Sequence, residues 1–445
     1  VYKRQHMYLH LSEAVSRGMV SESRLRAAVT NLYTTRLKLG MEQDKELPDN
    51  PYDKIPYSVV DSVEMREFNE SVSEKTFVLL KNNGILPLNR EKLRTIAVIG
   101  PNADSRRALV GNYEGTASRY ITISEGIQDY VGDSVRVLVS EGCDLYKENW
   151  KKNRIAEVRE MAEMSDVVIL CLGLDAGIEG EQGDAGNDFA SGDKPDLKLP
   201  GEQNQILEAA LDSGKPVVVL LLSGSALAVN TAQERAAAVM QCWYPGAQGG
   251  RAAARILFGE VSPQGHLPVT FYKSTEELPE FTDYSMKNRT YRYMKQEALY
   301  PFGYGLTYTS FSYDNMECGA GRQTFQKMKA GEKIQLPVSV RVCNTGNFDC
   351  AETVQVYVKA LCDGSPNPQL KGFGKVFLKA GEEKQVTVWL SEEAFELYDE
   401  NGQIYFTDEG YTVYIGGSQP DTRSRTLTGT IPLRQNLWSE VVNNT

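Results

Sequence analysis

Runs of apolar residues recur through the middle of the chain and constrain its fold more than any other feature. They occupy 96–100, 135–138, 167–172, 217–222 and 238–243. Several contain no polar residue, which is typical of parallel β-strands whose two faces are both covered by helices. Amphipathic helical patterns fit between them, for example at 155–164 and 203–211. The sequence therefore predicts an open α/β sheet, with functional residues in the loops beyond the carboxyl ends of its strands.

The residues before this region read as helices. Residues 7–40 predict two of them, with Ser21 as an N-cap of the second and Gly40 at its end. A stretch rich in proline, aspartate and asparagine at 46–51 predicts a linker, and a third helix is expected at 63–73.

The residues after it change to short alternating strands separated by turns. The expected strands are 334–342, 354–358, 374–378, 384–390, 405–406 and 411–415. Regularly spaced short strands predict a β-sandwich. Before them, the aromatics and glycines of 300–308 suggest a segment packed across another domain, because a structureless loop of this length rarely lies free.

The composition excludes several classes of function. The 48 basic and 59 acidic residues give a net charge of −11, which argues against a nucleic-acid partner and suits a neutral substrate. No apolar run approaches the roughly 18 residues needed to span a bilayer, so no membrane partner is expected. The seven cysteines form no CxxC pair and the histidines number three, so neither a metal site nor a cofactor is predicted. Free thiols suit a reducing compartment, which favours a cytoplasmic location.

The loop after the third of these strands is the densest chemical candidate. Residues 175–196 hold seven carboxylates among glycines. One of them could donate a proton to a leaving group if burial or a like charge raised its pKa. A solvated acidic loop is the alternative, and it stays open at this point. The spacing of Glu181, Asp184 and Asp188 does not match an EF-hand, so calcium binding is not predicted.

Two weaker motifs carry no function. The glycine-containing 99–103 lacks the spacing of a phosphate-binding loop. Residues 223–225 place two serines after a strand, but a nucleophile elbow needs GxSxG and a histidine partner.

Several longer strings resemble glycoside hydrolase family 3. They are VLLKNNG (78–84), VIGPNA (98–103), WYPGAQGG (243–250), LFGEVSPQGHLPV (257–269) and YPFGYGLTY (300–308). In this order they look like the second domain of that family. LKGF (370–373) and LKAGE (378–382) resemble its trailing fibronectin type III-like domain. The resemblance covers nearly the whole chain after residue 7.

The resemblance implies an active site shared between two domains. In the family a (β/α)₈ barrel supplies an aspartate nucleophile, and the α/β domain supplies the acid/base glutamate from a loop. The family pattern there is Glu-Gly-x-Asp-Arg. Glu181 is the best match and Glu179 the second, although the glycine is displaced by one and no arginine follows Asp184. Residues 8–41 look like the last helical region of the barrel, so the nucleophile is expected outside this chain.

The function implied is that of the C-terminal part of a retaining exo-β-glycosidase of the β-xylosidase, α-L-arabinofuranosidase or β-glucosidase type. Its substrate would be an oligosaccharide or an aryl glycoside, and its partner the barrel domain, without which the chain is expected to be inactive. A homo-oligomer is compatible with this reading. The alternative is a non-catalytic carbohydrate-binding or scaffold module that acts alone.

The resulting fold class is a multidomain α/β plus β chain. The expected domains are a barrel remnant at 1–48, an interdomain linker region at 49–93, an α/β sandwich domain with the acid/base loop at 94–272, a connecting segment at 273–315 and a fibronectin type III-like domain at 316–435.

Overall fold

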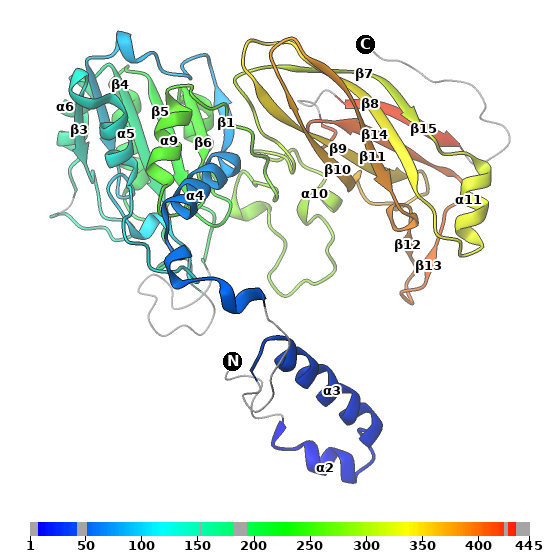
Figure 1. Cartoon of the computed structure of the whole chain (residues 1–445). Helices are drawn as coiled ribbons and strands as arrows, with labels where there is room; N and C mark the ends of the chain where they lie inside the picture. The colour runs from blue at the N-terminus through cyan, green and yellow to red at the C-terminus, as the bar shows by residue number, and fades with distance from the viewer. Residues whose placement is uncertain (1–7, 42–50, 152, 181–193, 422–425, 433–445) are drawn as a thin grey trace. The chain divides into compact units, whose positions relative to one another are not determined.

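The computed structural model in Figure 1 describes residues 8–41, 51–151, 153–180, 194–421 and 426–432. Its contacts divide the chain into two compact units, Val1–Met65 and Arg66–Thr445. Each unit is described by itself.

The first unit contains the two helices expected before the linker. They are α2 (Leu11–Ser16) and α3 (Glu22–Lys38). The Ser21 hydroxyl accepts a hydrogen bond from the Arg24 amide over 3.2 Å, which caps α3, and Gly40 beyond its end has a φ of +68°. These contacts confirm the predicted start and end of the helix. Neither α2 nor α3 buries a residue.

The second unit begins within α4 (Val63–Thr76) and contains a six-stranded sheet. Its strands are β1 (Val78–Asn82), β2 (Thr95–Ile99), β3 (Arg136–Ser140), β4 (Val167–Gly173), β5 (Val217–Leu222) and β6 (Ala238–Gln241). In space the order is β1-β6-β5-β4-β2-β3, and every pair except the antiparallel β1 and β6 is parallel. Every residue of β4 and β5 is buried, as the unbroken apolar runs predict.

Helices cover both faces of this sheet, which confirms the α/β expectation (Figure 1). One face packs on α6 (Ile155–Glu163), α7 (Gln203–Asp212) and α8 (Asn230–Arg235). The other packs on α5 (Ile123–Val131) and α9 (Gly249–Leu257). These last two helices approach so closely that a Cβ on Gly126 would lie 2.0 Å from the Gly250 carbonyl oxygen.

The β-sandwich follows as two sheets around a second apolar core. One has the order β10-β9-β14-β15 and the other β11-β8-β7. The strands are β7 (Phe311–Cys318), β8 (Leu336–Asn344), β9 (Cys350–Ala360), β10 (Gln369–Leu378), β11 (Glu383–Leu390), β14 (Gly410–Gly416) and β15 (Thr426–Pro432), with α11 (Arg322–Lys329) after β7 and the short pair β12 (Leu397–Tyr398) and β13 (Ile404–Tyr405) before β14. The sandwich was predicted, but β7, α11, β12 and β15 were not.

The aromatic segment 300–308 joins the two domains, as its composition suggested. Phe302 stacks on Tyr291 of α10 (Thr290–Tyr293) with ring centroids 4.2 Å apart. Both rings meet the edge of Tyr357 on β9. On the other side the Leu306 amide donates to the Leu79 carbonyl of β1 over 2.8 Å.

Candidate active site

The carboxyl ends of β4, β5 and β6 meet at one edge of the sheet because these strands are parallel neighbours. The loops that follow them start at residues 174, 223 and 242. Loops at this edge are where α/β folds form binding sites. The carboxylate-rich loop is the one after β4, and its first residues lie against the other two loops.

Asp175 organises the start of that loop. Its Oδ1 accepts hydrogen bonds from the amides of Gly177 over 2.8 Å and Ile178 over 3.1 Å. Its Oδ2 lies 3.6 Å from Nε of the exposed Arg107. The side chain is buried, and its oxygens are engaged by these groups. Asp175 therefore fixes a turn, and it is not the free carboxylate that proton transfer needs.

Glu179 lies where the three loops meet. Its Oε2 accepts a hydrogen bond from the Gly224 amide over 2.7 Å and another from the Tyr244 hydroxyl. Its Oε1 is buried and has no hydrogen-bond partner among the described residues. The side chain named second in the sequence analysis is thus held at the sheet edge by two donors.

Tyr244 reaches Glu179 through an unusual backbone. The preceding residue, Trp243, has a φ of +58°, which side-chain-bearing residues rarely adopt. Its indole nitrogen donates to the Thr76 carbonyl over 3.1 Å, which holds this turn in place. Burial, and then the charge and hydrogen bond of Glu179, raise the pKa of the Tyr244 phenol above its usual value. The phenol therefore stays protonated and remains a donor.

Lys194 lies near the C-terminal end of the same loop. Its ammonium donates to the Ser225 hydroxyl over 2.9 Å and to the Ala226 carbonyl over 2.7 Å. Burial lowers the pKa of Lys194, and the charge of Glu179 opposes that effect. No pattern in the sequence singles out Lys194, because a lysine in a polar loop has no local signature of a partner 31 residues away.

Glu181, the first choice for the acid/base residue, lies outside the described residues, as do Asp184 and Asp188. Its assignment stays a prediction. Glu179 is described, but no observation tests its catalytic role.

The serines after β5 have structural partners. The Ser223 hydroxyl donates to the Ser225 carbonyl over 2.8 Å, and the buried Gln241 amide donates to both the carbonyl and the hydroxyl of Ser223. The aromatic segment 300–308 is also engaged in packing. Tyr300 is fully buried and meets Phe271 edge to face at 6.0 Å.

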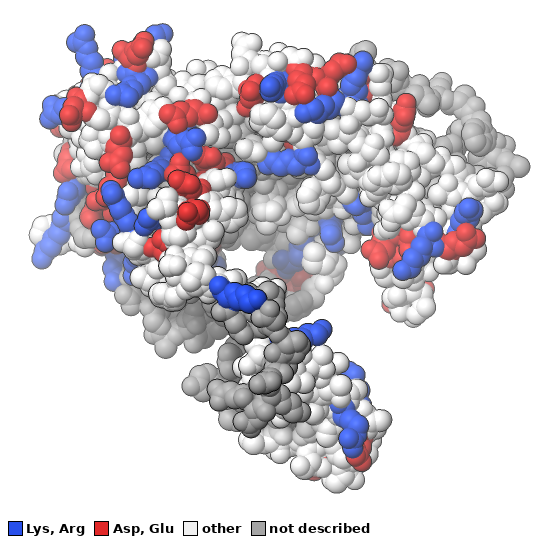
Figure 2. All heavy atoms as spheres, viewed as in Figure 1, with Lys and Arg blue, Asp and Glu red and all other residues white. Residues whose placement is uncertain are grey.

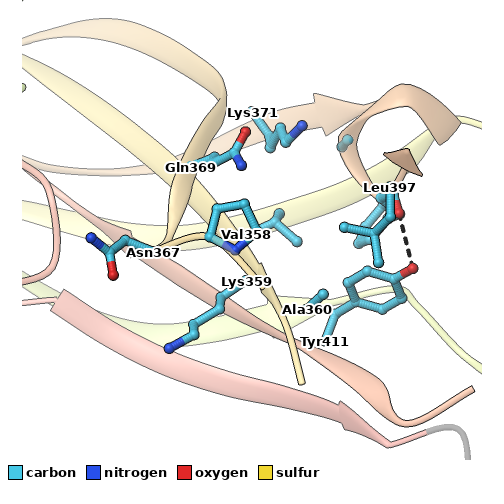
Figure 3. A pocket seen from close by; sticks show the side chains of 11 residues that line it. Val358, Lys359, Ala360, Asn367, Gln369, Lys371, Leu397 and Tyr411 are labelled. Atoms are coloured by element: carbon cyan, nitrogen blue, oxygen red, sulfur yellow. Dashed lines mark hydrogen bonds between the residues drawn. The ribbon is translucent and has the colours of Figure 1, made fainter. Parts of the chain in front are cut away.

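A separate small cavity lies in the sandwich, far along the chain from this edge (Figure 3). Lys359, Asn367, Gln369, Lys371 and Tyr411 are among its lining residues, and the Tyr411 hydroxyl donates to the Phe395 carbonyl over 2.9 Å. Its volume is about 20 Å³, which is enough for a water molecule but too small for a sugar ring. It is therefore not a candidate active site.

In the described part of the chain, neither the surface charge, nor a cluster of metal-binding side chains, nor a membrane-spanning helix indicates a further function. Figure 2 shows acidic and basic side chains interspersed on the face it views. Among the described residues, no three His, Cys, Asp or Glu side chains gather closely enough to hold a metal ion. Within the same ranges, every helix is too short or too polar to cross a membrane.

Comparison with protein families gives two matches. The model described as "Glycosyl hydrolase family 3 C-terminal domain" matches residues 77–308, and the one described as "Fibronectin type III-like domain" matches residues 352–419. The first contains the whole sheet and the edge where Glu179 lies.

Named relatives match most of the chain. A β-xylosidase from Formosa agariphila is 31% identical over an alignment of 425 positions that covers 91% of this chain and 55% of the relative. A periplasmic β-glucosidase from Salmonella typhimurium is 29% identical, over 92% of this chain and 56% of the relative. The solved structure of a β-glucosidase from Erythrobacter marinus is 30% identical with a TM-score of 0.77, and the match covers 95% of this chain and 57% of that one. The chain thus spans about half the length of these relatives.

Proposed function

Because this chain belongs to glycoside hydrolase family 3, we propose that it is the C-terminal part of a retaining exo-β-glycosidase and contributes the general acid/base. The rest of the site, including the nucleophile, would come from a (β/α)₈ barrel outside this chain. Relatives named β-xylosidase and β-glucosidase support a β-linked xyloside or glucoside as the substrate class.

The observation that carries the proposal is the position of Glu179 at the carboxyl edge of the sheet. Its two donors fix the start of a loop that holds further carboxylates. Retaining glycosidases need two carboxyl groups about 5–5.5 Å apart, one as nucleophile and one as acid/base. A loop anchored at the edge of one domain suits the delivery of the second carboxyl group to a nucleophile on another.

Within this loop we assign the proton transfer to Glu181 and a supporting role to Glu179. Glu179 is already engaged by the Gly224 and Tyr244 donors, whereas a proton donor must be free to reach the glycosidic oxygen. Glu181 would then protonate the glycosidic oxygen, and as a carboxylate it would later take a proton from the attacking water.

Substitution in the longer enzyme, with the upstream coding sequence restored, tests this assignment. Glu181→Ala should slow substrates with poor leaving groups by about 10²–10⁴-fold. Nitrophenyl glycosides should suffer far less at the first step because their leaving group needs no proton. Added azide should then restore turnover by replacing the base-assisted water. If Glu179→Ala shows this pattern and Glu181→Ala does not, the assignment is wrong but the mechanism stands. If neither shows it, this loop does not hold the acid/base.

The alternative, a carbohydrate-binding or scaffold module, predicts a different result for the 445-residue chain alone. A module would bind xylo- or gluco-oligosaccharides without hydrolysis, whereas the proposed enzyme part would neither hydrolyse nor hold them without its barrel. Calorimetric titration with both sugars, beside an assay with nitrophenyl xyloside, arabinoside and glucoside, separates the two.

A further inference from the structure

Both described ends of the carboxylate-rich loop contact the same short segment after β5. At the first end, Glu179 accepts a hydrogen bond from the Gly224 amide over 2.7 Å. At the second, Lys194 donates to the Ser225 hydroxyl and the Ala226 carbonyl. The residues that hold the two ends, 224–226, are consecutive and follow a fully buried strand. The described residues on the two sides of 181–193 are therefore held by the same segment.

The first contact depends on close packing. A Cβ on Gly224 would lie 2.9 Å from Glu179 Oε2 and 3.1 Å from Tyr244 Cε2. A side chain at residue 224 would therefore have to displace the Glu179 carboxylate, which Tyr244 also contacts from the loop after β6. The positive φ of Trp243 strains the backbone, and such strain persists only where surrounding contacts hold the residue in place. Residues strained in this way concentrate at functional sites.

We propose that Tyr244 and Lys194 are positioning residues, which clamp the two ends of this loop onto the segment 224–226. The inference rests on the proposed function, in which the loop supplies the acid/base carboxyl group. A proton donor misplaced by about 1 Å loses on the order of 10²-fold in rate, so a long loop that serves this role needs fixed ends. Tyr244 acts through Glu179 and Lys194 through backbone and hydroxyl oxygens, and neither is placed on the substrate.

Amide hydrogen exchange on the 445-residue chain tests the clamp without any assay of activity. The Gly224 amide donates to Glu179, so its exchange reports on the first end. Tyr244→Phe should speed that exchange on the order of tenfold, because Glu179, which accepts from the Gly224 amide, loses the hydrogen bond from Tyr244 that holds it in place. Tyr308→Phe is the matched control, since it removes a buried hydroxyl that donates to the Ile256 carbonyl elsewhere in the fold. It should leave Gly224 unchanged.

Lys194→Met tests the second end independently, so the proposal stays testable if Tyr244→Phe does not fold. The Ala228 amide donates to the Leu197 carbonyl over 2.7 Å, just beyond Lys194, and should exchange faster in this variant. Unchanged exchange of Gly224 in Tyr244→Phe, or of Ala228 in Lys194→Met, would overturn the clamp at that end.

Kinetics of the longer enzyme separate positioning from mere folding. A loss of folded protein lowers kcat by the same factor for every substrate. Loss of positioning should lower kcat on the order of tenfold for poor leaving groups, with KM little changed, and much less for activated ones. A uniform effect on all substrates would leave these residues structural and end the proposal. If the exchange data support the clamp while neither Glu181→Ala nor Glu179→Ala shows the leaving-group pattern, the clamp stands and the proposed function fails.

Discussion

Gln355 of β9 donates a hydrogen bond from Nε2 to the Gly303 carbonyl over 3.0 Å, which ties the sandwich to the segment that crosses from the sheet. The contact leaves no space for a side chain on residue 303. A Cβ there would lie 2.2 Å from Gln355 Oε1 and 2.5 Å from the Tyr357 hydroxyl. Gly303 also has a φ of +74°, which disfavours any other residue.

Gly303→Ala should therefore destabilise the chain by about 2–4 kcal/mol, through backbone strain and the displaced partners together. Gly331→Ala is the matched control, because Gly331 has a φ of +80° but nothing within 4 Å of the added Cβ. It should cost only about 1–2 kcal/mol. Chemical denaturation measures both, and equal losses would show that the junction tolerates a side chain.

Glu352 should make the stability of the sandwich depend on pH. Burial raises the pKa of Glu352 from 4.5 to about 7, while the hydrogen bond from Tyr313 and the charge of Lys375 oppose the rise. A raised carboxyl pKa contributes stability that is complete below the unfolded value and is lost as pH rises through the folded one. The free energy of unfolding should thus lose about 3 kcal/mol of this contribution between pH 4.5 and pH 7.

Glu352→Gln isolates this effect, because glutamine keeps the shape without titrating. The free energy of unfolding of the wild type, relative to that of the variant, should fall as pH rises from 4.5 to 7. The subtraction cancels other groups, including His266, whose pKa burial lowers to about 4. A difference that stays flat from pH 5 to pH 8 would contradict the raised pKa.

Arg255 links α9 to α4 through ion pairs, and it should contribute more to the free energy of unfolding than an ordinary surface charge. Its Nη1 lies 2.9 Å from Glu70 and 2.6 Å from Glu74, and both carboxylates are largely shielded from solvent. Arg255→Met leaves them without this partner and should cost about 1–3 kcal/mol. Arg235→Met breaks the exposed pair with Asp212 and should cost less than about 1 kcal/mol. Urea denaturation of the two variants tests the difference.

The exposed apolar face of α3 should promote self-association of the 445-residue chain. Val29, Leu32 and Tyr33 are each between 43% and 57% exposed, and their spacing puts them on one side of the helix. Replacing Val29 and Leu32 by glutamine should reduce dye binding and association without loss of stability. Thr34→Gln, at an exposed polar position, is the control. Sedimentation velocity that shows a monomeric wild type would count against this prediction.

The sequence by itself determined the classes of the domains, because apolarity and its period are local properties. The unbroken runs at 167–172 and 217–222 became fully buried parallel strands, and the regular spacing after residue 311 became a sandwich. Ser21 likewise predicted the start of α3, because an N-cap contacts only the first turn of its helix. The strings that resemble glycoside hydrolase family 3 were also recognisable in the sequence alone. The strand β15 and helix α11 were missed, because their polar residues obscure any clear period.

Only the tertiary structure decided what surrounds Glu179. Gly224 and Tyr244 lie 45 and 65 residues further along the chain, and nothing near either residue signals a carboxylate partner. They meet because β4, β5 and β6 are neighbours in the sheet, an order fixed by how the helices pack on its faces and not by any one segment. A motif can thus identify the candidate catalytic loop from the sequence. The groups that contact this loop follow other strands, which become its neighbours only when the chain folds.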